Sequence, residues 1–195
     1  MMEIKDTATS GADIIQIESH LKVPPNSEIK VDLPLGELYK KDLEFQAMRG
    51  QIINSSLWVE EKIELLIAKL LIPSGGEASG LFISCVLGRE FFTFMAKWKV
   101  LRDLLKAVSP LNEKDHSKML TDIKEIIDVR DMFAHGKNLY LGDGKENKLV
   151  IEYFKDGLKR EEVTSSFLEE HNRKAKELYM RLDELTRVID RISVH

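Results

Sequence analysis

The sequence has little of what several protein classes require. It contains a single cysteine, Cys85, so neither an internal disulfide nor a cysteine-based metal site can form within the chain. Its longest apolar run, residues 63–72, includes Glu64 and Lys69 and is shorter than the roughly 20 residues of a membrane-spanning helix. The first residues lack a secretory-signal pattern. We therefore expect a cytoplasmic protein with no membrane segment, and we expect Cys85 to be a small core residue.

An excess of positive charge is also missing, because 29 Lys and Arg face 33 Asp and Glu, which gives a net charge of -4. A site for RNA would therefore have to be a local basic patch. The most basic stretch is the candidate for such a phosphate-facing surface, with an ordinary solvated helix face as the alternative. Its basic residues are Arg89, Lys97, Lys99, Arg102 and Lys106.

The chain is long enough for one domain with a sizeable core. In residues 1–35, apolar and polar residues alternate around V-P-P-N-S, which predicts short strands or an arm that becomes ordered only on contact. Residues 36–195 predict an all-α, up-and-down bundle of four or five helices, because apolar residues recur at three- and four-residue steps. The expected helices cover residues 37–72, 78–87, 91–108 and 119–136, and the last begins near a capping box at Ser166 and Glu169.

Between the last two helices the pattern changes. Apolar runs separated by G-D-G-K and K-D-G turns predict a small β-hairpin or meander at about residues 138–163. The D-G-K segment lacks the series of acidic residues that a calcium loop needs, so we expect no metal and no cofactor.

The most informative stretch is residues 119–136, M-L-T-D-I-K-E-I-I-D-V-R-D-M-F-A-H-G. On a helix, Arg130 falls in the middle of its apolar stripe, about 20° from Ile123. An unpaired buried guanidinium costs several kcal/mol, roughly, so it must be paired or face a cleft or a partner chain. Glu60, Glu61 and Glu64 could include a partner for it within the chain, although at least two of the three are more typical of solvated surface acids.

Two further polar residues lie near Arg130. Asp131 and His135 are four residues apart, which places them within reach of each other on a helix, and Gly136 then favours the end of that helix. A histidine titrates near neutral pH and can donate or accept a proton. His171, on the apolar seam of the last helix, is more typical of a structural hydrogen bond than of a catalytic residue.

The segment R-D-M-F-A-H-G resembles the R-x4-6-H motif of HEPN domains. The M-R-G-Q-I-I-N-S-S-L-W-V-E-E-K segment is similar to the first long helix of that family, and residues 91–108 resemble the second core helix of mannitol-operon-repressor relatives. The resemblance implies a small helical bundle. Many members are metal-independent ribonucleases that act as homodimers with both motifs at one shared cleft, and others only bind nucleotides or proteins.

Carried over to this chain, the resemblance implies that Arg130 binds phosphate and that His135 transfers protons. Asp131 occupies a position where asparagine is the commonest choice of the family. It would either orient the imidazole or pair with Arg130 and weaken the attraction for phosphate. The alternatives to a ribonuclease are a non-catalytic regulatory or protein-interaction module, repressor-like or one component of a toxin–antitoxin pair, and a purely structural role for Arg130 and His135.

Overall fold

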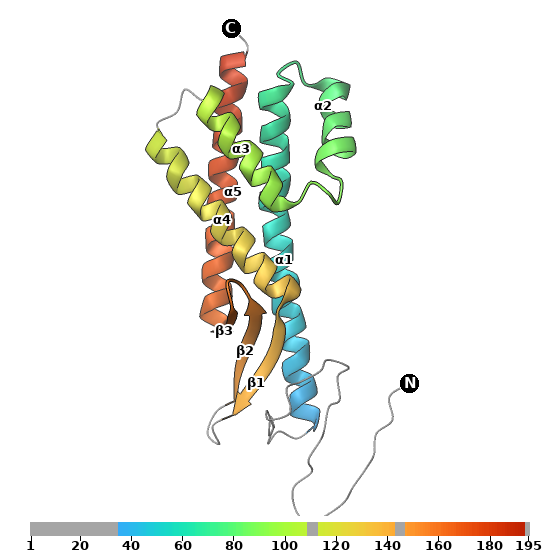
Figure 1. Ribbon diagram of the computed structural model, residues 1–195, viewed down its shortest axis with the longest axis vertical. Coiled ribbons are helices and arrows are strands. Elements are labelled where there is room, and N and C mark those ends of the chain that lie inside the picture. The colour runs from blue at the N-terminus through green and yellow to red at the C-terminus, as the bar shows by residue number, and fades with distance from the viewer. Residues whose placement is uncertain (1–34, 109–112, 143–146, 194–195) are drawn as a thin grey trace, which may run out of the picture. The chain divides into compact units, whose positions relative to one another are not determined.

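The structure is a computed structural model, and it describes residues 35–108, 113–142 and 147–193 (Figure 1). The predicted arm therefore lies outside the described residues, apart from residue 35. The described residues form five α-helices, one π-helical turn and three strands: α1 Leu35–Leu71, α2 Gly76–Phe82, η1 Ile83–Leu87, α3 Phe94–Val108, α4 Glu113–His135, β1 Lys137–Gly142, β2 Asn147–Phe154, β3 Leu158–Glu162 and α5 Ser165–Ser193. The predicted class, a helical bundle with a small β ornament, is confirmed.

These elements belong to two compact units. The larger unit contains α1 from Met48 onward, α2, η1, α3, α4 and α5, and the smaller unit contains the first part of α1 and the sheet. None of the described helices is both long and apolar enough to cross a membrane.

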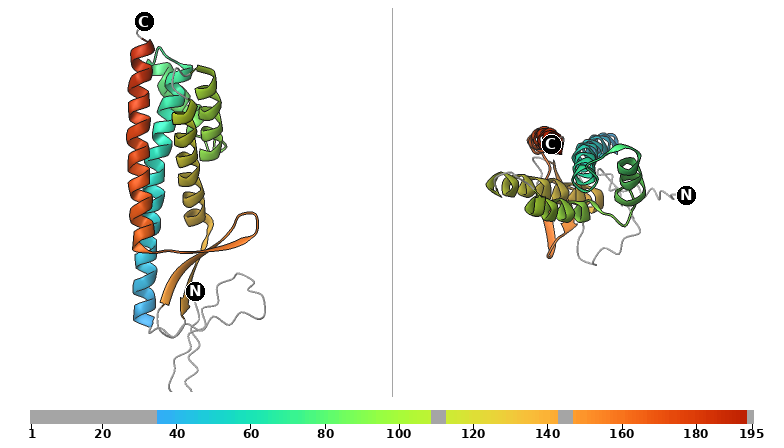
Figure 2. Two further views of the ribbon diagram at one scale, coloured as in Figure 1. Left: turned by 90° about the vertical axis from the view of Figure 1, so that its left-hand side faces the viewer. Right: turned by 90° about the horizontal axis from the view of Figure 1, so that it is seen from above.

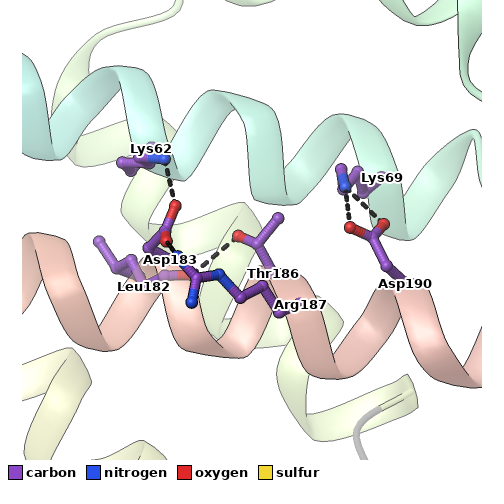
Figure 3. Close-up of polar contacts among 7 residues, drawn as sticks. All are labelled: Lys62, Lys69, Leu182, Asp183, Thr186, Arg187 and Asp190. Atoms are coloured by element: carbon purple, nitrogen blue, oxygen red, sulfur yellow. Dashed lines mark hydrogen bonds and ion pairs between the residues drawn. The ribbon is translucent and has the colours of Figure 1, made fainter.

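In the larger unit, α1 and α5 run in the same direction and lie side by side (Figure 2). Two ion pairs join them, Lys62 with Asp183 and Lys69 with Asp190 (Figure 3). The second pair follows the first by seven residues on each helix. This is the spacing of charged pairs that flank a parallel two-helix seam. The pairs therefore fix the register of α1 against α5.

The apolar stripes that the sequence predicts form the core of the larger unit. Its buried residues come from α1, η1, α3, α4 and α5: Val59, Ile63, Leu66, Ile67, Leu87, Phe94, Leu101, Leu105, Met119, Ile123, Ile126, Ile127, Ala175, Leu178, Leu182 and Leu185. The four α4 residues in this set confirm the predicted stripe of the motif helix.

A buried ion cluster joins α1 to α3. The Lys97 ammonium, on a side chain 6% exposed, donates to the carboxylates of Glu60 and Glu64. Burial lowers the pKa of Lys97, but the two hydrogen bonds outweigh it and hold this pKa above its ordinary value. Two expectations are therefore wrong: Lys97 does not belong to a phosphate-facing surface, and Glu60 and Glu64 bind Lys97 instead of Arg130.

Two local expectations are also wrong. Cys85 is exposed; it lies in the π-helical turn η1, in which Leu87 is the buried residue. At the start of α5, the hydroxyl of Thr164 accepts the hydrogen bond of the Phe167 amide at 3.1 Å. Thr164 is therefore the N-cap, two residues before the expected Ser166.

In the smaller unit, the sheet is an antiparallel meander with strand order β1-β2-β3. Phe154 pairs with Leu158 across a tight turn, in which Asp156 and Gly157 have φ values of 53° and 119°. This is the predicted K-D-G turn, and its glycine allows the positive φ. The sheet occupies the predicted part of the chain.

Candidate functional site

The three candidate residues lie on the last turns of α4. The side chains of Arg130 and Asp131 are 33% and 49% exposed, and His135 is exposed on the final helical turn. Arg130 Nη1 donates a hydrogen bond to Asp131 Oδ1 at 2.8 Å. Arg130 is therefore neither sealed in the bundle nor paired with a glutamate of α1; its carboxylate partner is its own neighbour in sequence.

Arg130 lies on the apolar stripe of α4, but its charged side chain reaches solvent. Ile123, Ile126 and Ile127 on the same stripe are at most 1% exposed, whereas a third of the Arg130 side chain is accessible. Long cationic side chains commonly bury the aliphatic stem and keep the charged head in water. The guanidinium is therefore available to a ligand, in competition with Asp131.

The carboxylate of Asp131 binds only one of the two partners expected for it. Within the described part of the chain, its carboxylate is hydrogen-bonded to Arg130 and not to His135. An exposed ion pair of this kind is worth up to roughly 1 kcal/mol, so a phosphate can displace it. The alternative in which Asp131 lowers the attraction for phosphate is the one that this geometry favours.

A second guanidinium reaches the same helix end from α1. Arg49 Nη2 donates to the backbone oxygen of Ala134 at 2.6 Å. The last carbonyls of a helix lack partners and carry partial negative charge, so a cation there stabilises the helix end. Sequence reasoning did not single out Arg49; its only signal was the R-G pair of the resemblance. The contact places a positive charge at the end of the helix that carries His135.

The start of α5 packs against the end of α4 that carries the candidate residues. The rings of Phe133 and Phe167 stack with centroids 6.0 Å apart, and His171 is 5% exposed one turn further along α5. Burial lowers the pKa of His171 from 6.5 to about 4, although a hydrogen bond with the backbone of Ile52 acts in the opposite direction. His171 is therefore neutral at pH 7, in agreement with the structural role expected for it.

His171 predicts a loss of stability in mild acid. The unfolded chain binds a proton at this residue near pH 6.5 and the folded chain only near pH 4, so stability that is fully present above pH 6.5 is lost as the pH falls toward 4. The expected loss is about 3 kcal/mol, from 1.36 kcal/mol for each pKa unit. Urea unfolding at pH 7 and pH 4 measures it. His171→Leu should lose correspondingly less than wild type, and an equal loss in both proteins would contradict the prediction.

The other candidate sites, a metal site and the basic stretch of α3, have less structural support. Among the described residues, no three His, Cys, Asp or Glu side chains are grouped so that they could hold a metal ion. On α3, the guanidinium of Arg102 pairs with Asp103 and lies over the Trp98 ring, 5.2 Å from its centroid. Lys99 and Lys106 remain exposed on α3, but with Lys97 buried and Arg102 paired this surface is weaker than the basic stretch of the sequence suggested.

Comparison with family models, with curated proteins and with solved structures found no match. The interpretation of the site therefore depends on the motif and on the geometry of this chain.

Proposed function

We propose that this chain is a HEPN-like, metal-independent endoribonuclease that acts as a homodimer, with Arg130 and His135 at a shared cleft. The observation that supports the proposal is the end of α4, where an accessible guanidinium and an exposed imidazole lie five residues apart. Arg49 adds a second positive charge at the same helix end. This is a local basic site on a chain of net charge -4.

The residues have the chemistry that the reaction needs. A base removes the proton of a ribose 2′-hydroxyl, the 2′-oxygen attacks the adjacent phosphorus, and an acid protonates the leaving 5′-oxygen. The products are a 2′,3′-cyclic phosphate and a 5′-hydroxyl. Arg130 grips the phosphate oxygens and stabilises the charge that builds on them, and His135 transfers the protons.

The need for both a base and an acid supports the homodimer. Among the described histidines, His116 and His171 are buried and only His135 is exposed. One protomer thus offers one histidine from the described residues, while the reaction uses two proton-transfer groups. A second copy facing the first supplies the other imidazole and a second Arg130.

The alternative is a non-catalytic regulatory or protein-interaction module. The Arg130–Asp131 pair favours it, because the carboxylate partly neutralises the one guanidinium that the motif contributes. In that case the purified protein leaves RNA intact with or without EDTA.

Asp131→Asn distinguishes the two functions. Removing the carboxylate frees Arg130, so RNA affinity and cleavage should rise about two- to fivefold, the worth of an exposed ion pair. Filter binding and gel-based cleavage of a labelled single-stranded RNA measure both. Asp128→Asn, which removes the carboxylate that binds Lys124 on the same helix, is the matched control and should change neither. Unchanged affinity in Asp131→Asn would contradict phosphate binding by Arg130.

A further inference from the structure

The last turn of α4 contains a carbonyl for which the helix itself provides no donor. The oxygen of Met132 accepts the amide of Gly136 at 2.8 Å, which closes the last turn. The residue four positions after Ala134 is Asn138, which belongs to strand β1, so the helix offers the Ala134 oxygen no amide. Arg49 Nη2 donates to this oxygen at 2.6 Å. The end of α4 therefore depends on a donor from α1.

This hydrogen bond acts directly on His135. The oxygen of Ala134 and the nitrogen and Cα atoms of His135 lie in one planar peptide unit, which moves as a whole. A donor that fixes the oxygen therefore also fixes the point from which the His135 side chain begins. Arg49 thus limits where the imidazole can lie, and it does so through the backbone.

Contacts with α5 hold both partners of this hydrogen bond in place. On α4, the ring of Phe133 is 1% exposed and stacks on Phe167 of α5. On α1, the backbone of Ile52, three residues after Arg49, is hydrogen-bonded to His171 of α5. Each of the three helices is therefore joined to the other two at this level. The bond from α1 to α4 belongs to the packed bundle, and it is not a chance contact between two loose surface groups.

The position of His135 matters because it is the last residue of α4 and its side chain is exposed. Helix ends fray, and a displacement of about 1 Å can reduce a reaction rate by about 100-fold. We propose that Arg49 is a positioning residue of the proposed ribonuclease, whose bond to Ala134 keeps the His135 imidazole where it transfers protons. The inference rests on the proposed function and gives Arg49 a role beyond its charge.

Arg49→Met tests the proposal, because it removes the donor and keeps most of the aliphatic stem. The turnover number should fall about tenfold, since the imidazole occupies its reactive position less often. The dissociation constant for RNA should change by no more than about threefold, because Arg130 still binds the phosphate. Single-turnover cleavage and filter binding of a labelled RNA measure the two quantities. Arg49→Lys, whose ammonium can donate to the same oxygen, should restore most of the rate.

A second measurement needs no RNA. The Gly136 amide exchanges with solvent only when the last turn of α4 opens, and this opening breaks the bond from Arg49. In Arg49→Met the exchange should be about tenfold faster, because hydrogen bonds of charged donors are among the stronger ones. Hydrogen exchange followed by NMR measures it. Lys176→Met, which removes a positive charge from an exposed position of α5, is the control and should change neither exchange nor turnover.

Two results would overturn the inference: exchange at Gly136 that keeps the wild-type rate in Arg49→Met, or turnover that stays at the wild-type value in this variant. The second result includes a loss confined to RNA affinity, which would make Arg49 a phosphate contact, and a loss confined to thermal stability, which would make it only a helix cap. Wild-type protein that leaves RNA intact would contradict the ribonuclease together with the inference. Wild-type protein that cuts RNA no faster than Arg49→Met would contradict the inference alone.

Discussion

Replacing His135 with alanine is expected to reduce RNA cleavage by about 100-fold or more, the usual contribution of a proton-transfer group. In a symmetric dimer the substitution removes both imidazoles at once, so neither the base nor the acid remains. Initial rates on a labelled RNA in the presence of EDTA measure the loss. The thermal midpoint should stay unchanged, because His135 is exposed and surface substitutions shift stability by about 0.5 kcal/mol or less.

Lys118→Ala, at an exposed position of the same helix, is the matched control and should retain the wild-type rate. RNA affinity should fall less than the cleavage rate in His135→Ala, because Arg130 still binds the phosphate. A His135→Ala protein that cuts as fast as wild type would remove His135 from the reaction.

The second large effect concerns stability. Lys97→Met leaves the carboxylates of Glu60 and Glu64, 13% and 15% exposed, without their shared cation. Breaking a buried ion cluster by removing one partner costs about 3–5 kcal/mol. For a chain of this size the thermal midpoint should fall by about 10 °C, which scanning calorimetry or circular dichroism measures. Lys99→Met, at an exposed position of α3, should leave the midpoint unchanged.

A triple variant separates unpaired charge from lost packing. When Glu60→Met and Glu64→Met accompany Lys97→Met, no buried charge remains, and apolar side chains of similar size fill the site. Such replacements of buried ion pairs are commonly neutral or stabilising. The midpoint should recover most of the loss. A triple variant as unstable as the single one would show that the cluster acts through packing.

Two cations on apolar stripes show how far the sequence could lead. The apolar stripe of α4 predicted that Arg130 needs a partner or an opening, whereas Lys97 was predicted to belong to a basic stretch that faces phosphate. The sequence could not predict whether each cation is paired within the chain or reaches solvent, because that depends on the facing helix. Lys97 faces Glu60 and Glu64 on α1 and is buried with them, whereas Arg130 lies near the end of α4 and reaches solvent.

The helix positions were predictable for a related reason. A three- and four-residue period depends only on the order of residues, so the stripes of α4 and α5 could be read directly. Arg49 could not, because its contact with Ala134 joins residues 85 positions apart. Cys85 was misplaced because its burial was inferred from the apolar character of its neighbours, whereas Leu87 is the buried residue of η1.

The most direct test of the proposed ribonuclease is the reaction of the purified wild-type protein with single-stranded RNA in the presence of EDTA, followed by analysis of the new ends. The proposal predicts fragments with 2′,3′-cyclic phosphate and 5′-hydroxyl ends, and no cleavage of an RNA whose 2′-hydroxyls are methylated. RNA that stays intact, or cleavage that survives methylation, would contradict it.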